Sequence, residues 1–230
     1  MGGQSHCLPG FEPGFEHDGA ALHRGAALSV SGALLARAFR YPPDQAGIRL
    51  YGDSAIAGHL HGGPIHAVAA HYLGGAARPV RAILFDKTGA ANWGLGWHQD
   101  RTIAVAARHD LPGYDPWSRK AGLIHVEPPF AVIAAMVTLR VHLDDVPHDN
   151  APLLIAPGSH RLGRVPDALI GETVARCGTY SCLATAGDIW AYATPIVHAS
   201  APAKAARHRR VLQVDYSTMT LPAPLAWRGV

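Results

Sequence analysis

The chain has 230 residues, of which 48% are hydrophobic and 16% charged, the composition of a folded globular protein and not of a disordered or fibrous one. Its formal charge of +3 comes from basic residues scattered along the chain, so the basic stripe of a nucleic-acid-binding protein is missing. The longest apolar stretch, residues 129–139, is too short to span a bilayer.

Residues 1–80 mix strand and helix signals. We expect a first strand over 19–28 and a short helix over 30–39, which Tyr41-Pro42 ends. Asp53 or Ser54 has the side chain to cap a second helical region. Gly62-Gly63-Pro64 interrupts that region, and it resumes over 65–73.

From residue 80 onward, short β-like runs alternate with Gly, Pro and Asp. The predicted strands are 80–86, 98–106, 132–143, 152–156, 180–184, 188–192, 196–200 and 209–217. About eight strands separated by turns indicate a β-sandwich or barrel, with a jelly roll as the leading case. We therefore expect one domain over 1–230, in which a mixed segment 1–80 supports a jelly-roll core over 81–230.

The segment 107–129 is long for a connection without secondary structure. It carries Tyr114, Trp117, Lys120 and His125. Loops of this length in compact domains usually serve as lids or binding loops. We interpret it as a lid that faces the substrate, with a disordered surface excursion as the alternative.

Two histidines and one aspartate form the main candidate site. If residues 98–106 form a strand, His98 and Asp100 point to the same face, because side chains alternate along a strand. His198 lies in a second predicted strand. Two imidazoles and one carboxylate with open remaining positions are the ligand set of non-haem Fe(II) oxygenases. The chain holds 15 histidines, so the alternative is that this pattern is incidental.

An arginine near the C-terminus adds a second element. A dicarboxylate that chelates iron through one end needs a cation for its other carboxylate, and arginine provides a bidentate, permanently charged partner. Arg207, Arg209 and Arg210 are the candidates, and a solvated basic cluster is the alternative. Strand alternation does not choose among them, because Arg209 and Arg210 lie on opposite faces.

Other polar positions are open. Arg140 interrupts an apolar run, so it either contacts a cosubstrate or substrate or forms a salt bridge with Asp144 or Asp145. Lys87 and Asn92 face the pocket or form a surface hairpin. Two further sets of residues are interpreted as structural: the pair His66 and His71, and the turn 157–160.

The chain resembles the phytanoyl-CoA dioxygenase family of Fe(II)/2-oxoglutarate oxygenases. The segments that carry the resemblance are spread along the chain: residues 15–19 with 24–25, 97–100, 150–153 with 157–160, 187–188, 198–200 and 209–210. Each is weak alone, and together they are specific. One departure is Ala151, where the family usually has glycine; we expect this change to alter the local loop and leave the metal site untouched.

The resemblance implies a double-stranded β-helix with peripheral helices, and Fe(II), 2-oxoglutarate and O2 as cofactor and cosubstrates. It implies His98, Asp100 and His198 as iron ligands. The family's spacing selects Arg209 as the cosubstrate arginine, and Gln99 and Ser200 match positions that line the cosubstrate pocket. With Arg140 and Lys87 they make up the predicted cosubstrate-binding set: Arg209, Gln99, Ser200, Arg140 and Lys87.

The expected activity is a dioxygenase that hydroxylates a C–H bond of a small-molecule metabolite, with succinate and CO2 as co-products. Related halogenases have a small residue in place of Asp100, so the carboxylate favours hydroxylation. The alternatives are a cupin-type metal-binding isomerase and a non-catalytic metal-binding β-barrel. Neither would need Arg209.

The cellular setting follows from weaker signals. Cys7, Cys177 and Cys182 are an odd number without zinc-site spacing, as expected of free thiols in a reducing compartment. The N-terminus has no charged segment followed by an apolar run. We expect a cytoplasmic monomer or homodimer that binds neither nucleic acid nor membranes.

Overall fold

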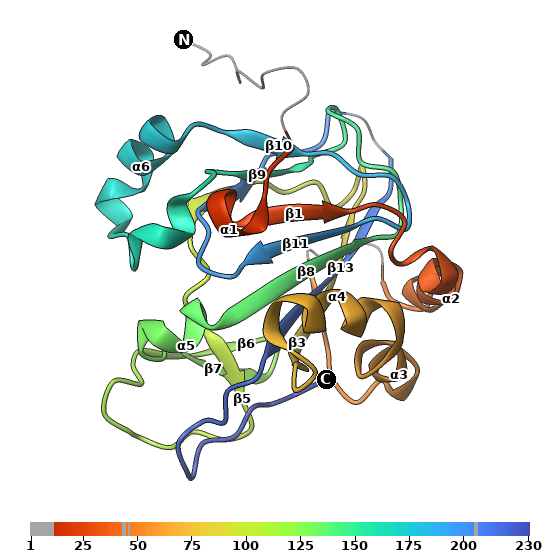
Figure 1. The fold of residues 1–230 in the computed structure, drawn as a ribbon. Helices are drawn as coiled ribbons and strands as arrows, with labels where there is room; N and C mark the ends of the chain where they lie inside the picture. Colours follow the sequence, from red (N-terminus) through yellow and green to blue (C-terminus); the bar gives the residue numbers. More distant parts are fainter. Residues whose placement is uncertain (1–11, 43–44, 46, 205–206) are drawn as a thin grey trace.

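Two antiparallel β-sheets form the body of the computed structural model, which describes residues 12–42, 45, 47–204 and 207–230 (Figure 1). The larger sheet has the strand order β1-β11-β8-β13-β3-β2, and the smaller has the order β10-β9-β12-β4. A third sheet, β5-β7-β6, lies beside them. This is the expected double-stranded β-helix, mainly β with peripheral helices.

The strands of the larger sheet are β1 (Ala20–His23), β2 (Ile48–Leu50), β3 (Arg78–Lys87), β8 (Met136–His142), β11 (Ile189–Ala193) and β13 (Arg209–Ser217). Those of the smaller sheet are β4 (Leu95–His98), β9 (Leu153–Ile155), β10 (Tyr180–Cys182) and β12 (His198–Ser200). The third contains β5 (Ile103–Val105), β6 (Trp117–Lys120) and β7 (Leu123–Val126). Because β1 and β2 pair within the larger sheet, the N-terminal segment is part of the same core.

The helices are α1 (Phe15–Asp18), α2 (Leu28–Ala38), α3 (Ser54–Leu60), α4 (Gly63–Leu73), α5 (Phe130–Ala134) and α6 (Ile170–Cys177), with 3-10 turns η1 (Ser159–Leu162) and η2 (Asp167–Leu169). Asp53 caps α3 by accepting hydrogen bonds from the amides of Ala55 and Ile56. Pro64 stands in the first turn of α4, where its missing N–H costs nothing. The predicted break between the two helices is confirmed, but it lies at residues 61–62, because α4 already begins at Gly63.

Helices α2, α3 and α4 cover one face of the larger sheet (Figure 1). Alternate residues of β8 and β13 point toward them, among them Leu139, Leu212 and Tyr216, all fully buried. Burying one such aliphatic side chain stabilises the fold by about 1.5–3 kcal/mol. None of the described helices is long and apolar enough to cross a bilayer.

The other face of the larger sheet points toward the smaller sheet. Over β1 and β11 the space between them is apolar, with Trp190, Tyr192, Leu153 and Ile155 packed together. Over β3, β8 and β13 it is lined by polar side chains instead. The candidate site lies at this polar end.

The strand predicted over 98–106 is wrong. Strand β4 ends at His98, residues 99–102 are irregular, and β5 begins only at Ile103. The predicted strand 132–143 is also too long, because the one-turn helix α5 follows Pro129 and precedes β8. Strand β2 has only three residues, too few for a period-two pattern to stand out.

The segment 107–129 is neither disordered nor structureless. Strands β6 and β7 form a hairpin that pairs with β5. The two linking residues, Ala121 and Gly122, both have positive φ, as the favoured two-residue hairpin turn requires. Trp117 packs into a local hydrophobic cluster, whereas Lys120 lines the cavity between the sheets. Cys177 is a free cysteine, Cys182 is buried, and Cys7 lies outside the described residues.

Candidate metal centre

His98, Asp100 and His198 bring one ligand atom each to within 4.8 Å of one another. His98 ends β4 and His198 begins β12, and the two residues are direct partners across these strands. Their ring centroids are 4.3 Å apart. No other group of three such side chains occurs among the described residues. The structure thus assembles the three residues that the sequence singled out.

Asp100 reaches this cluster by a different route from the one predicted. It lies two residues beyond the end of β4, so strand alternation does not place it. An ion pair does: Arg81 Nη2 lies 3.3 Å from Asp100 Oδ2, and Arg81 Nε also pairs with Asp215. Thr138 Oγ1 donates to Asp215 at 3.0 Å. This buried network holds the carboxylate next to the imidazoles.

Electrostatics keep Asp100 ionised. Burial raises the pKa of its carboxyl group, but Arg81 and the two histidines outweigh burial and hold the pKa below its usual range. Burial and the neighbouring His98 lower the pKa of His198 to about 4. At neutral pH the cluster therefore offers an anionic oxygen and a neutral imidazole, the forms that bind metals.

Backbone carbonyls orient both imidazoles. His98 Nδ1 lies 2.7 Å from the Gly96 carbonyl oxygen, and His198 Nδ1 lies 2.9 Å from that of Ile196. A carbonyl only accepts, so each Nδ1 carries the proton and each Nε2 keeps its lone pair. Two imidazoles and one carboxylate with the remaining positions free fit Fe(II).

A cavity of about 440 Å³ adjoins the cluster. Its lining includes all three candidate ligands and seven basic side chains: Arg49, Arg81, Lys87, Arg101, Lys120, Arg140 and Arg209. Three of them, Lys87, Arg140 and Arg209, come from β3, β8 and β13 and form no ion pair with a described residue. We call these three the inner cations.

Of the three candidate arginines Arg207, Arg209 and Arg210, Arg209 lines the cavity. It is 2% exposed, its Nη1 donates to the Ala151 carbonyl at 2.8 Å, and its Nε has no partner. Burial lowers the pKa of its guanidinium. Arg210 points to the opposite face, where it pairs with Asp144, and Arg207 pairs with Asp149 at the surface.

Lys87 and Ser200 contact each other in the cavity. Lys87 Nζ donates to Ser200 Oγ at 3.0 Å and to the Ala201 carbonyl at 2.6 Å. Burial, followed by repulsion from Arg209 and Arg140, lowers the pKa of Lys87 to about 7. An anion bound here would restore its charge.

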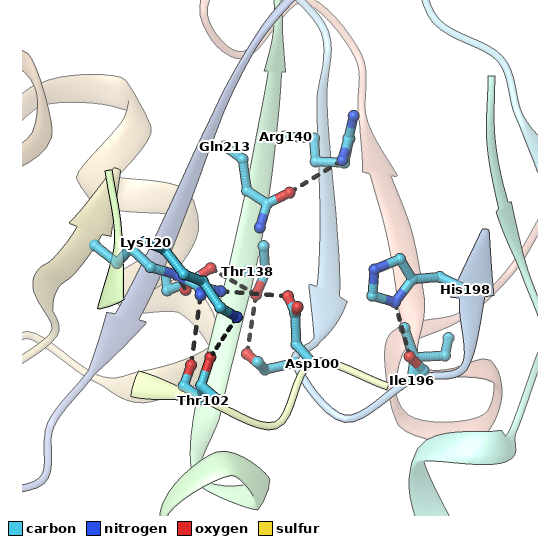
Figure 2. A network of polar contacts seen from close by, with 11 residues as sticks. Asp100, Thr102, Lys120, Thr138, Arg140, Ile196, His198 and Gln213 are labelled. Atoms are coloured by element: carbon cyan, nitrogen blue, oxygen red, sulfur yellow. Dashed lines mark hydrogen bonds and ion pairs between the residues drawn. The ribbon is translucent and has the colours of Figure 1, made fainter. Parts of the chain in front are cut away.

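Arg140 makes no salt bridge with either predicted acid. Its Nη1 donates to Gln213 Oε1 at 3.0 Å, as Figure 2 shows. Asp144 pairs with Arg210 instead, and Asp145 accepts a hydrogen bond from the Ala186 amide. Of the two open alternatives, the structure contradicts the salt bridge and places Arg140 in the cavity.

Gln99 has a structural task. Its Nε2 donates to the carbonyls of Gly163 and Pro195, and its Oε1 accepts from the Val165 amide. Both polar atoms of the Gln99 carboxamide thus bind backbone groups, so the structure gives no support for the predicted contact with the cosubstrate. Asn92 is exposed and bonds the backbone of Ala203, so it does not face the cavity.

Sequence reasoning missed Arg81, Asp215, Gln213, His142 and Arg49. A signal for part of this set was present, because Arg81 and Lys87 lie on one face of β3, and Arg209, Gln213 and Asp215 share one face of β13. His142 is buried two residues beyond Arg140, and both of its ring nitrogens lack a partner. For Arg49 no signal existed, since β2 itself was not predicted.

A larger cavity of about 700 Å³ shares no lining residue with the metal cluster. Its acidic residues already have partners: Asp144 pairs with Arg210, and Asp188 accepts from the amides of Gly25 and Thr185. Unpaired charge is concentrated in the smaller cavity, which is therefore the candidate site.

The family model of phytanoyl-CoA dioxygenase (PhyH) matches residues 32–211. No curated protein matches the chain. Solved structures with a similar fold include a non-heme alpha ketoglutarate dependent epimerase, SnoN, from nogalamycin biosynthesis. It is 17% identical with a TM-score of 0.62, and the match covers 93% of this chain and 82% of SnoN.

Two further structures share the fold. HygX from Streptomyces hygroscopicus, with nickel and 2-oxoglutarate bound, is 14% identical with a TM-score of 0.61; the match covers 88% of this chain and 84% of HygX. EctD from S. alaskensis, with bound Fe, is 17% identical with a TM-score of 0.61; the match covers 88% of this chain and 74% of EctD. At these identities the likeness concerns the fold.

Proposed function

Because the chain belongs to the phytanoyl-CoA dioxygenase family, whose chemistry depends on Fe(II), 2-oxoglutarate and O2, we propose that it hydroxylates a C–H bond of a small-molecule metabolite. Succinate and CO2 are the co-products of this reaction. The observation that carries the proposal is the position of His98, Asp100 and His198 beside a cavity with unpaired inner cations. A structural metal site would not need those cations.

His98, Asp100 and His198 would hold the iron. Their ion pair and backbone hydrogen bonds fix the ligand atoms before any metal binds, which lowers the reorganisation that binding requires. Bound iron, together with 2-oxoglutarate and O2, supplies the oxidising chemistry. The carboxylate of Asp100 occupies the position that halogenases leave open, which favours hydroxylation.

The inner cations would bind the carboxylate of 2-oxoglutarate that lies away from the metal. Arg209 offers an unused Nε, and Arg140 has an unpartnered Nε as well. Lys87 stands across the strand pair from Arg209. Buried cations without an acidic partner are costly to maintain, so a bound dicarboxylate accounts for all three.

Succinate release tests the proposal. Purified protein should convert 2-oxoglutarate to succinate only with Fe(II) and O2, and Asp100→Ala should abolish that turnover. Asp110→Ala, a change at an exposed acid paired with Arg108, is the matched control and should leave it intact. Unchanged turnover in Asp100→Ala would refute the proposal.

The product distinguishes hydroxylation from other outcomes of the same chemistry. Screening a metabolite panel for stimulated succinate release, followed by mass spectrometry, should give a product one oxygen atom heavier than its substrate. A product of unchanged mass but inverted configuration would show epimerisation instead.

A further inference from the structure

Two basic side chains of the cavity lie apart from the inner cations. Arg49 comes from β2 and Lys120 from the β6–β7 hairpin, and neither forms an ion pair with any described residue. The buried Nε of Arg49 has no hydrogen-bond partner among the residues that the structure describes. Toward the described residues, the ammonium of Lys120 makes a single hydrogen bond, a long one of 3.4 Å to Thr102 Oγ1. We call Arg49 and Lys120 the outer cations.

The outer cations lie on the Asp100 side of the metal cluster. Figure 2 shows Lys120 and Thr102 on one side of Asp100 and His198 on the other. The pKa values of both outer cations are lowered, by burial first and then by repulsion from Arg81. For Lys120, repulsion from Arg49 adds to this, so the two charges act on each other.

The sheet register separates Arg49 from the inner cations in two directions. Arg49 shares a row with Arg140 through Ile83 and Gln213, but β3 and β13 lie between their strands, β2 and β8. Arg49 pairs with Ile83, whereas Arg209 pairs with Lys87, four residues further along the same strand. Four residues correspond to about 13 Å. A five-carbon dicarboxylate that binds iron at one end and Lys87 and Arg209 at the other would leave Arg49 available for a second anion.

Charge balance requires a further anion. Arg81 is neutralised by Asp100 and Asp215, and Arg101 by Asp167. Fe(II) and the 2-oxoglutarate dianion carry equal and opposite formal charges, so loading the site leaves the excess of positive charge unchanged. A partly enclosed cavity with such an excess attracts anions. The outer cations contribute to that excess, and neither has an acidic partner among the described residues.

We propose that Arg49 and Lys120 bind an oxyanion group, a carboxylate or a phosphate, of the substrate to be oxidised. This inference rests on the proposed function and names the substrate class. Arg49 provides a planar fork of donors, and Lys120 a mobile point charge on the hairpin. The anion fixes one end of the substrate beside Asp100, and the rest of the molecule extends toward the metal.

Binding of simple anions tests the site without turnover. The protein is loaded with Ni(II) in place of iron and saturated with 2-oxoglutarate, so that the inner cations are occupied. Inorganic phosphate and acetate are then titrated by calorimetry. Arg49→Gln and Lys120→Gln should each weaken the preferred anion about tenfold, the loss expected for one charge-assisted contact. The two titrations show whether phosphate or carboxylate is preferred.

Arg119→Gln is the matched control. Arg119 neighbours Lys120 in β6 and carries the same charge, but it does not line the cavity. This variant should bind anions like the parent protein. If its affinity falls as far as that of Lys120→Gln, or if neither outer variant changes affinity, the site is refuted. Thermal melting of each variant confirms that it is folded.

A second measurement separates this inference from the proposed function. Affinity for 2-oxoglutarate should be unchanged in Arg49→Gln and Lys120→Gln; a loss would assign the outer cations to the cosubstrate and overturn the inference alone. In a substrate panel arranged as acids against their neutral esters, the acids should stimulate succinate release. Preference for the neutral members would also overturn it. Absence of succinate release with the unmodified protein would instead refute the proposed function.

Discussion

The two faces of the six-stranded sheet are built from the same strands and bury opposite chemistries. In β8, Val137, Leu139 and Val141 point toward the helices and pack in an apolar core. Their neighbours Thr138, Arg140 and His142 point toward the smaller sheet and are equally buried. Burial alone therefore does not distinguish the two faces, and the difference lies in whether the buried groups have partners.

On the helix-covered face the apolar core side chains gain free energy by leaving water, and the charged Arg210 has Asp144 as its partner. On the cavity face, Arg140, Arg209 and His142 leave water without full hydrogen bonding, which costs free energy. A fold keeps such groups where a ligand compensates them. We therefore expect mutations on the helix-covered face to change stability, and mutations on the cavity face to change ligand binding.

Leu139→Ala should have the largest effect on stability. The side chain is fully buried beneath the helices, so its truncation removes transfer free energy and leaves a cavity, at a cost of about 2–5 kcal/mol. Chemical denaturation would measure the loss. Arg140→Met, the adjacent change on the other face, should leave stability unchanged or raise it, because it removes an uncompensated buried charge. Equal losses in both variants would contradict the comparison.

Arg209 and Arg210 are adjacent and point to opposite faces. Arg209→Gln should weaken 2-oxoglutarate binding by about 2–4 kcal/mol, roughly 30-fold to 1,000-fold, because it removes the charged partner of a buried carboxylate. Arg210→Gln should leave the affinity unchanged and cost stability through its pair with Asp144 and its stacking on Phe39. Titration calorimetry with Ni(II)-loaded protein measures both. A comparable loss in the two variants would remove the case for Arg209.

Arg209 and Arg210 also show how much of this site the sequence predicts. Alternation in 209–217 predicts the strand with its observed bounds and separates Arg209 from Arg210. It does not say which face is covered by helices, since that depends on residues 28–73 folding over one side. The resemblance to a known family selected Arg209, and the structure supplies the reason: Arg210 lies on the helix side and stacks on Phe39.

Asp100 marks the limit of pattern reasoning. The sequence identified the residue but placed it on a strand, whereas a buried ion pair with Arg81 positions it. Arg81 is 19 residues earlier in the chain, and Asp215 is far beyond both. The Arg81–Asp215 contact follows from the register of β3 and β13, and Asp100 lies in an irregular segment, so a local sequence pattern encodes neither contact.

Lys87 gives the cavity face a pH dependence. Its pKa is about 7 in the folded protein, below the ordinary value for lysine. Below pH 7 the buried amine is charged in the folded and the unfolded chain alike, and its full burial cost applies. Above pH 7 the folded form loses the proton first, so stability attributable to Lys87 rises with pH until the unfolded chain also deprotonates.

Binding of 2-oxoglutarate should show the opposite trend. The dianion favours charged Lys87, so its affinity should fall by up to about tenfold per pH unit above pH 7. Calorimetry between pH 6 and 9 measures this slope, and Lys87→Met should flatten it while lowering the affinity at pH 6. A slope that survives in Lys87→Met would assign the titration to another group.

The smallest effect is expected where a loop of the cavity face carries residual strain. Ala151 has a φ of +51°, a left-handed conformation that alanine adopts at a cost of about 1–2 kcal/mol and glycine adopts freely. Ala151→Gly relieves that strain but adds freedom to the unfolded chain, so the net gain should be about 0.5–1 kcal/mol. Thermal melting would detect it as a small increase in Tm.

Because the Ala151 carbonyl accepts a hydrogen bond from Arg209, the same variant tests whether this loop positions the guanidinium. Unchanged affinity for 2-oxoglutarate alongside the higher Tm would show that the strain concerns the loop alone, and that the burial of Arg209 between the sheets is what holds it in place.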